Sequence, residues 1–250
     1  MTAALLLALA LPFVATAVAR GGEFLLVSAI CLTVVYGWQY LFAALRQTRV
    51  DQDGIATAAV FALMLPTAAP LWQVVLGLSF GVVIGEQIFG GRGRNMLNPV
   101  VVGLAFLIFS FPAGGYDAAG AAAAWMSLPG AVLLLIGGLI SWRIVVAAVA
   151  GLAISAALIG GAHPVDEVVL GGFVFGVIFL ASDPVCAPAT NPARWLYGLL
   201  IGFLVFLGRV GSDGTADGIV FAVLVAMIFA PLTDYAVIAA NARWRRRRYG

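Results

Sequence analysis

Two proline-broken stretches decide the fold of this chain: LPTAAPLW at residues 65–72 and DPVCAPATNPARW at residues 183–195. In each stretch an apolar run ends at a proline, a second proline and a tryptophan follow, and the next apolar run carries glycines four residues apart (residues 77–85 and 198–202). Proline interrupts a helix, and glycine lets another backbone approach closely. Interrupted segments at matching places in two halves indicate a membrane protein whose site is built from broken helices.

The composition agrees with a membrane protein. Of the 250 residues, 63% are hydrophobic and 10% are charged, whereas globular proteins carry about 25% charged residues. The apolar runs are long and continuous, which favours helices over a barrel. The first run, residues 3–19, ends in an Ala-x-Ala-like pattern but lacks a basic start, so we interpret it as a membrane span and not as a signal peptide.

We predict an all-α, polytopic membrane protein with about ten transmembrane helices. Several of the runs, notably 55–66, 98–112 and 129–141, are shorter than the roughly 20 residues that a crossing needs. The candidate spans are residues 3–19, 24–45, 55–66, 70–89, 98–112, 129–141, 143–160, 167–182, 194–209 and 217–238.

The arginines predict the orientation. All 13 basic residues are arginine, and the net charge is only +2, so no nucleic-acid partner is predicted. If the N-terminus is cytoplasmic and all ten spans cross, every arginine except Arg20 and Arg209 lies on the cytoplasmic side, as the positive-inside rule requires. We therefore expect a multi-pass protein of the bacterial inner membrane with both termini in the cytoplasm. The cluster at residues 243–248 would meet anionic lipid headgroups.

The same topology predicts an inverted repeat. The first break faces the outside and the second faces the cytoplasm, so the two halves have opposite orientations. We predict a first five-helix repeat at residues 1–120, a second at 121–240 and a basic cytoplasmic tail at 241–250, with a pathway between the halves. The alternative is a chance similarity, because proline and glycine are common in membrane helices.

Three motifs resemble one protein family. Residues 65–99, LPTAAPLWQVVLGLSFGVVIGEQIFGGRGRNMLNP, closely resemble the NqrB component of the sodium-translocating NADH:quinone oxidoreductase (Nqr) and the RnfD component of the Rnf electron transport complex. Residues 183–195 and 229–241 resemble the second and the C-terminal signature of that family. The resemblance implies two inverted repeats with a urea-channel-like fold. It also implies a membrane component of a translocase, a complex that couples electron transport to movement of Na⁺ or H⁺. In such a complex this chain would be a non-catalytic subunit that works with other subunits.

The resemblance implies flavin as well, and there the sequence departs from the family. Family members attach FMN to the last threonine of a Ser/Thr-Gly-Ala-Thr motif, and the stretch that aligns with it, residues 117–123, has Ala122 at that position. Alanine has no hydroxyl, so we expect no covalent FMN, while non-covalent riboflavin or FMN stays open. The chain also lacks the long N-terminal extension of NqrB and so resembles a short RnfD-like member.

Three acids are candidates for a cation pathway. Glu86 lies in a predicted span, where an acid is costly unless it faces water, a cation or an arginine; the alternative is an ion pair with Arg92 or Arg94. Asp183 ends a run at a break, where it lines the pathway; the alternatives are that it caps the next segment or pairs with Arg194. Asp234 matches a family acid that the resemblance associates with sodium. The alternative is that Asp234 is simply a solvated acid at the end of a helix.

The glycine-rich loop between residues 90 and 98 offers a second kind of contact. Its backbone N–H groups, with Arg92, Arg94, Asn95 and Asn98, could hold an anion or a non-covalent flavin. The alternative is that Asn98 caps a half-helix while the two arginines fix the topology. The two cysteines of the chain lie far apart with no CxxC or Cys/His cluster, so no metal site is predicted.

Three functions fit these patterns. The leading hypothesis is the cation-translocating membrane component of an Nqr/Rnf-type complex, without covalent FMN. The second is a stand-alone channel or solute transporter with the same fold. The third is a structural anchor that holds a redox partner through the cytoplasmic arginines.

Overall fold

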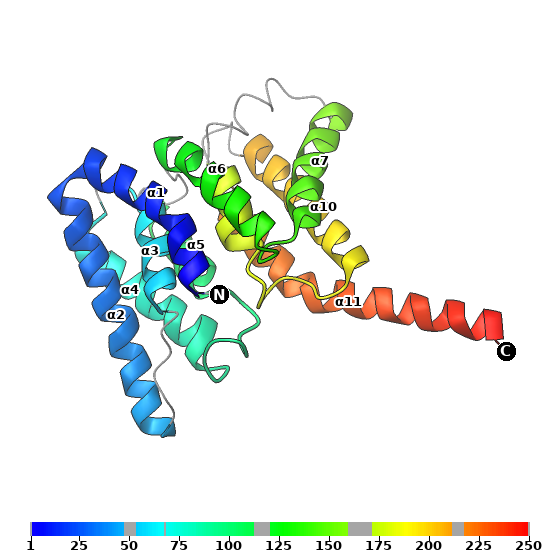
Figure 1. The fold of residues 1–250 in the computed structure, drawn as a ribbon, viewed down its shortest axis with the longest axis horizontal. Coiled ribbons are helices and arrows are strands. Elements are labelled where there is room, and N and C mark those ends of the chain that lie inside the picture. Colours follow the sequence, from blue (N-terminus) through cyan, green and yellow to red (C-terminus); the bar gives the residue numbers. More distant parts are fainter. Residues whose placement is uncertain are drawn as a thin grey trace.

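The computed structural model describes residues 2–47, 54–67, 69–112, 121–159, 172–211 and 218–249, and within these ranges the chain is helical with no strand. Ten helical segments follow one another, which confirms the predicted all-α class (Figure 1). In chain order they are α1 (Thr2–Arg20), α2 (Gly22–Arg46), α3 (Gly54–Met64), α4 (Leu71–Val82) with its π-helical continuation η1 (Val83–Gln87), α5 (Pro99–Ser110), α6 (Ala121–Ile136), α7 (Trp142–Ile159), α9 (Gly172–Phe175) with its π-helical continuation η3 (Gly176–Ala181), α10 (Asn191–Gly211) and α11 (Ile219–Tyr249).

The segments fall into a long and a short set. In the described part of the chain, 5 helices are long and apolar enough to cross a membrane, namely α1, α2, α7, α10 and α11. The others are apolar but shorter, as the sequence predicts for residues 55–66 and 98–112. The short α3 is buried along almost its whole length. A helix that is apolar all round suits a place among other helices in a membrane, so the chain is a multi-pass membrane protein.

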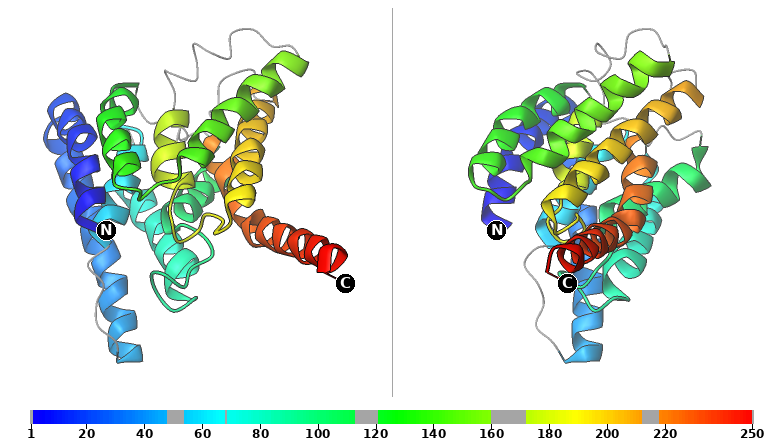
Figure 2. Two further views of the ribbon diagram at one scale, coloured as in Figure 1. Left: turned by 45° about the vertical axis from the view of Figure 1, so that its right-hand side comes forward. Right: turned by 90° about the vertical axis from the view of Figure 1, so that its right-hand side faces the viewer.

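Two predicted boundaries differ from the structure. The span predicted at residues 129–141 is α6, which begins at Ala121 and contains Pro129 inside it, because neighbouring helices let membrane helices accommodate proline. The last span does not end near residue 238: α11 continues as helix to Tyr249, because arginine is a good helix former. The C-terminal part of α11 projects away from the helical body (Figures 1 and 2).

The two sets of five helices share a pattern of neighbours. In the first set α4 packs against α2 and α5, and in the second set α10 packs against α7 and α11. Two pairs join the sets, α1 with α6 and α5 with α11. This order is the one that an internal repeat would produce, and the division at residue 120 stays a prediction.

Both glycine stripes produce the close approach that the sequence predicts, but against different neighbours. A methyl group at Gly81 would overlap the Pro99 carbonyl, so α4 uses its glycines against α5. A methyl group at Gly202 would overlap the Ala148 carbonyl, so α10 uses its glycines against α7. The packing of the two halves is therefore similar in order and different in detail.

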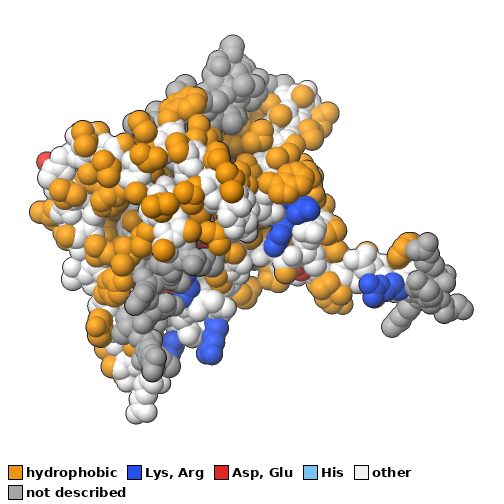
Figure 3. Space-filling model, in the orientation of Figure 1, with side chains coloured by type: hydrophobic (Ala, Val, Ile, Leu, Met, Phe, Trp, Pro, Cys, Tyr) orange, Lys and Arg blue, Asp and Glu red, His pale blue; other side chains and the backbone are white. Residues whose placement is uncertain are grey.

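Arginines mark the two ends of the helical bundle. Beside the start of α2, Arg20 donates a hydrogen bond of 2.6 Å to the Leu65 carbonyl at the first break. At the end of α2, Arg46 donates to the Gln87 carbonyl. On the face drawn in Figure 3, the described basic side chains gather over the lower part of the molecule. The orientation of the chain in the membrane stays a prediction.

Candidate functional site

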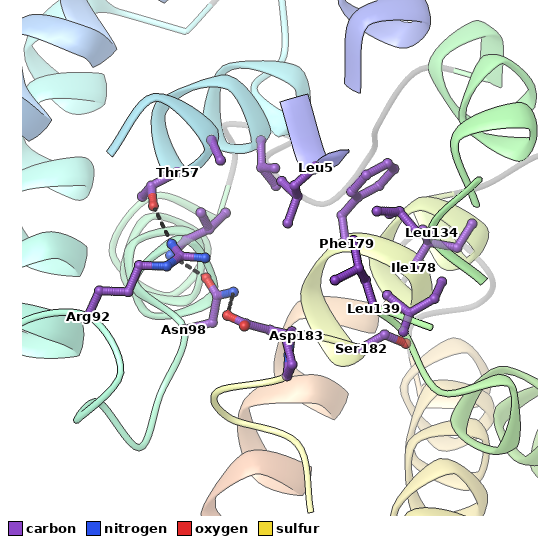
Figure 4. A pocket seen from close by; sticks show the side chains of 15 residues that line it. Leu5, Thr57, Arg92, Asn98, Leu134, Leu139, Ile178, Phe179, Ser182 and Asp183 are labelled. Atoms are coloured by element: carbon purple, nitrogen blue, oxygen red, sulfur yellow. Dashed lines mark hydrogen bonds between the residues drawn. The ribbon is translucent and has the colours of Figure 1, made fainter. Parts of the chain in front are cut away.

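A small central cavity lies where the two halves meet. Its volume is about 30 Å³, which leaves room for about two water molecules. The polar side chains Thr57, Arg92, Asn98 and Asp183 line one side, while apolar side chains from α6 and η3 line the other (Figure 4). A polar wall facing an apolar wall inside a membrane bundle makes this the candidate site.

Asn98 ties the two halves together at this cavity. It is the N-cap of α5, where its Oδ1 accepts a 2.9 Å hydrogen bond from the Val100 N–H and Pro99 takes the first helical position. Its Nδ2 donates a 2.8 Å hydrogen bond to Asp183 Oδ2, a residue 85 positions away. The predicted helix cap is confirmed, and the same side chain also holds the buried acid of the second break.

Asp183 lies directly after η3, where the helix stops. Its side chain is only 8% exposed, and its Oδ1 accepts a hydrogen bond from the Val185 N–H. The carboxylate thus caps the turn that follows it, as one of the sequence interpretations expects, and it also lines the cavity. Its neighbour Ser182 donates its hydroxyl back to the Val177 carbonyl and closes the π-helical turn.

Arg92 and Arg94 point to different places. Arg92 lines the cavity and donates to Thr57 Oγ1 at 3.4 Å, whereas Arg94 is exposed and packs over the backbone at Gly90. The loop needs its glycines, because Gly90, Gly91 and Gly93 all have positive φ.

The N–H groups of this loop are already in use. Gly90 and Gly91 donate to carbonyls of η1, and Gly93 donates to Asn95 Oδ1 at 3.1 Å. The loop thus folds on itself, with these N–H groups turned to internal acceptors.

Asn95 forms a second link between the halves. It is 6% exposed, and its Nδ2 donates to the Leu97 carbonyl at 2.9 Å and to Cys186 Sγ at 3.4 Å. The Cys186 thiol in turn donates to the Asn95 carbonyl at 3.9 Å. Two asparagines of one loop, Asn95 and Asn98, therefore form hydrogen bonds with two residues of the second break, Cys186 and Asp183.

Glu86 is the more deeply buried acid, with 2% of its surface exposed. It lies in η1, and Gln87 Nε2 donates a 3.0 Å hydrogen bond to its Oε1. Glu86, Asp183 and Arg92 are all close enough to act electrostatically on the Cys186 thiol. Glu86 does not line the central cavity, so of the two π-helical segments only η3 ends at it. π-helical turns are frequent at functional sites.

Asp234 does not line this cavity. It projects from α11 and accepts hydrogen bonds of 2.8 Å from the Ala189 N–H, 2.9 Å from the Thr190 N–H and 2.6 Å from the Thr190 hydroxyl. Arg194 lies within electrostatic range of it and donates to the Pro188 carbonyl. Asp234 therefore fixes the second break just before α10 begins.

The position that aligns with the family's flavin-bearing threonine lies at the edge of the described chain. Residues 117–120 of that stretch are outside the described residues, and Ala122 is in the first turn of α6. An alanine carries only a methyl group, which cannot form a phosphodiester. The sequence departs from the covalent FMN site by this missing hydroxyl.

Three features of the site escape sequence reasoning. Thr57, which meets Arg92, and Cys186, which meets Asn95, stand in apolar surroundings with no signal of their own. The π-helical turns carry no sequence signature either. Only the packing of the loop before α5 against α3 and against the second break brings these residues together.

These features define a class: a multi-pass membrane protein in which buried acids lie between interrupted helices. The sequence profile of the NQR2, RnfD, RnfE family matches residues 1–119 and 115–243, and the chain belongs to this family. The resemblance seen in the three motifs is thereby confirmed.

Curated relatives are similar over most of the chain. The B subunits of the Na(+)-translocating NADH-quinone reductases of Klebsiella pneumoniae and Pseudomonas aeruginosa are each 37% identical to it, over 91% and 92% of this chain and 70% and 71% of their own lengths. The protein of the same name from Yersinia pestis is also 37% identical, over 90% of this chain and 68% of its own length.

Proposed function

We propose that this chain is a membrane component of an ion-translocating electron transport complex of the Nqr/Rnf type. Family membership supports this, together with relatives that are named as parts of a sodium-translocating reductase. The chain would supply the ion path and no redox chemistry. Partner subunits would supply the electrons, since the relatives are named as one subunit of a multi-subunit reductase.

The buried link between Asn98 and Asp183 is the observation that carries the assignment of the pathway. Asp183 brings a carboxylate to the cavity beside the Arg92 guanidinium. Glu86 lies outside the cavity lining, in η1 next to Gln87, whose carbonyl accepts from Arg46. A small monovalent cation, Na⁺ or H⁺, suits such a site, and a narrow water-sized cavity favours brief binding over tight retention. Asp234 would act on the pathway by holding the second break.

The role within a complex has a direct test. The chain, tagged in its native host and purified in mild detergent, should bring down flavin or iron–sulfur subunits that mass spectrometry identifies. Purification of the chain alone, combined with cation flux through it in liposomes without any electron donor, would instead favour a stand-alone channel. Purification with a redox partner but without ion dependence would favour a structural anchor.

We propose further that the chain carries no covalent FMN, because Ala122 offers no oxygen for a phosphodiester. The central cavity is also far below the roughly 300 Å³ of ordinary ligand pockets, so a non-covalent flavin would need it to open. The protein should lose all yellow colour on acid precipitation. Flavin retained in the precipitate would refute the proposal.

We also propose that the protein lies in the bacterial inner membrane with both termini cytoplasmic. The separation of Arg20 and Arg46, which lie at opposite ends of α2, supports this orientation. A fluorescent protein fused after Gly250 should fluoresce, whereas alkaline phosphatase fused there should stay inactive. The reverse pattern would overturn the orientation.

A further inference from the structure

A second, larger cavity lies beside the central one. We call it the arginine cleft; it is lined by the connection between α6 and α7, the first turn of α7, the second break and Arg194. Its volume is about 550 Å³, within the range of small-molecule sites. Leu139, Ile140, Ser182 and Pro184 line both cavities and so lie between them. The proposed cation path does not require a cavity of this size.

The side chains of this cleft carry positive charge, which disfavours a bound cation. Arg143 and Arg194 both line it. Arg194 is partly compensated by Asp234, but Arg143 only packs over the Trp142 ring, 5.0 Å from the centroid, and meets no acid among the described residues. A guanidinium at the membrane boundary without a counter-charge favours an anion nearby.

The residue before α7 adds an unused polar group. The Ser141 hydroxyl oxygen is shielded from solvent and has no hydrogen-bond partner in the described part of the chain, although it lines the cleft. A serine at this position normally accepts from the N–H groups of the first helical turn. Here the Ile144 N–H turns to the Ser141 carbonyl at 3.0 Å instead. The hydroxyl is therefore unpaired among the described residues, in a residue that lines the cleft and precedes a helix start that favours negative charge.

We propose that the arginine cleft binds a phosphate group, carried either by an anionic lipid headgroup or by a soluble phosphate ester. Arg143 would contact the phosphate oxygens as the principal cation, Ser141 would donate its hydroxyl, and Arg194 would add a second positive charge. Trp142 and Trp195, which meet edge to face at 5.7 Å, would flank the bound group at the depth where aromatic side chains meet headgroups. This site is separate from the proposed cation path and stands without it.

The test uses the purified full-length chain and two arms. In the soluble arm, thermal unfolding in detergent is followed with inorganic phosphate or glycerol 3-phosphate, with sodium chloride at matched ionic strength as reference. In the lipid arm, native mass spectrometry compares retention of phosphatidylglycerol with that of phosphatidylcholine. We expect stabilisation or selective retention in at least one arm, and the arm that responds identifies the source of the phosphate.

Four variants test whether the response comes from the cleft. Arg143→Gln should weaken the response by about tenfold, because it removes a charge-assisted contact. Arg245→Gln removes the same charge from the exposed end of α11 and should leave the response of the soluble arm unchanged, which makes it the control for that arm. If Arg143→Gln does not fold, Ser141→Ala should weaken the response and Arg143→Lys should largely keep it. No response in either arm, or equal losses in the cleft variants and Arg245→Gln, would overturn the proposal.

Discussion

At the scale of single residues, the site depends on side chains that each serve two partners. Asn98 caps α5 and holds Asp183, and Asn95 folds its own loop and meets Cys186. The sequence predicts the cap, since an asparagine before a proline is a familiar helix start. It does not predict the partner, because the hydrogen bond between Asn98 and Asp183 depends on how the two halves pack.

The bond between Asn98 and Asp183 should be worth a measurable part of the stability. Asn98→Ala removes one hydrogen-bond donor from the buried Asp183 carboxylate and should cost about 1–3 kcal/mol in unfolding free energy. Asp183→Ala should cost a similar amount. The double variant should cost less than the sum of the two, as followed by denaturant unfolding in detergent. Strict additivity would mean that the two side chains do not interact.

Asp234 can be tested for a role beyond anchoring. Thr190→Val removes the hydroxyl that donates to Asp234 at 2.6 Å and leaves the carboxylate in place. If Asp234 acts by holding the second break, Thr190→Val and Asp234→Asn should both lower the free energy of unfolding by about 1 kcal/mol or more. The two substitutions should also change the apparent cation affinity of the complex to the same extent. A loss of cation affinity in Asp234→Asn alone would place its carboxylate on the pathway.

At the scale of helices, apolar length and the proline breaks predict most of the architecture. They predict ten segments and the short central helices, and the glycine spacing predicts close approach. They do not predict that α4 uses its glycines against α5 while α10 uses its glycines against α7. Glycine spacing shows that a face is flat, and the choice of neighbour depends on the shapes of all the helices around it.

The glycine contacts should be intolerant of a single methyl group. Gly81→Ala and Gly202→Ala would each press a methyl group into a neighbouring backbone and should destabilise the protein by about 1–3 kcal/mol. Gly37→Ala in α2 is the matched control, because nothing lies within 4 Å of its added methyl group, and it should be neutral or stabilising. Thermal unfolding of the three variants checks this. Tolerance of both substitutions at Gly81 and Gly202 would contradict the packing.

At the scale of the whole molecule, function depends on the meeting of two halves. The predicted placement of a pathway between them fits the central cavity, where the loop before α5 meets the break after η3. The arginine cleft lies outside sequence reasoning, since Arg143 and Arg194 each serve equally well as topology signals. Only the packed structure brings them to one cleft with Ser141, whose hydroxyl has no hydrogen-bond partner among the described residues.

The central claim is that redox-driven cation movement passes Glu86 and Asp183. Its most direct test is uptake of radioactive sodium and of protons into inverted membrane vesicles that hold the assembled complex and are energised by an electron donor. Asp183→Asn and Glu86→Gln should lower the apparent affinity for the transported cation by about tenfold or more, as loss of a charged contact predicts. Glu23→Gln, a change at an exposed acid in the first turn of α2, should behave as the unaltered protein does. Unchanged uptake in both Asp183→Asn and Glu86→Gln, with the complex intact, would contradict the account.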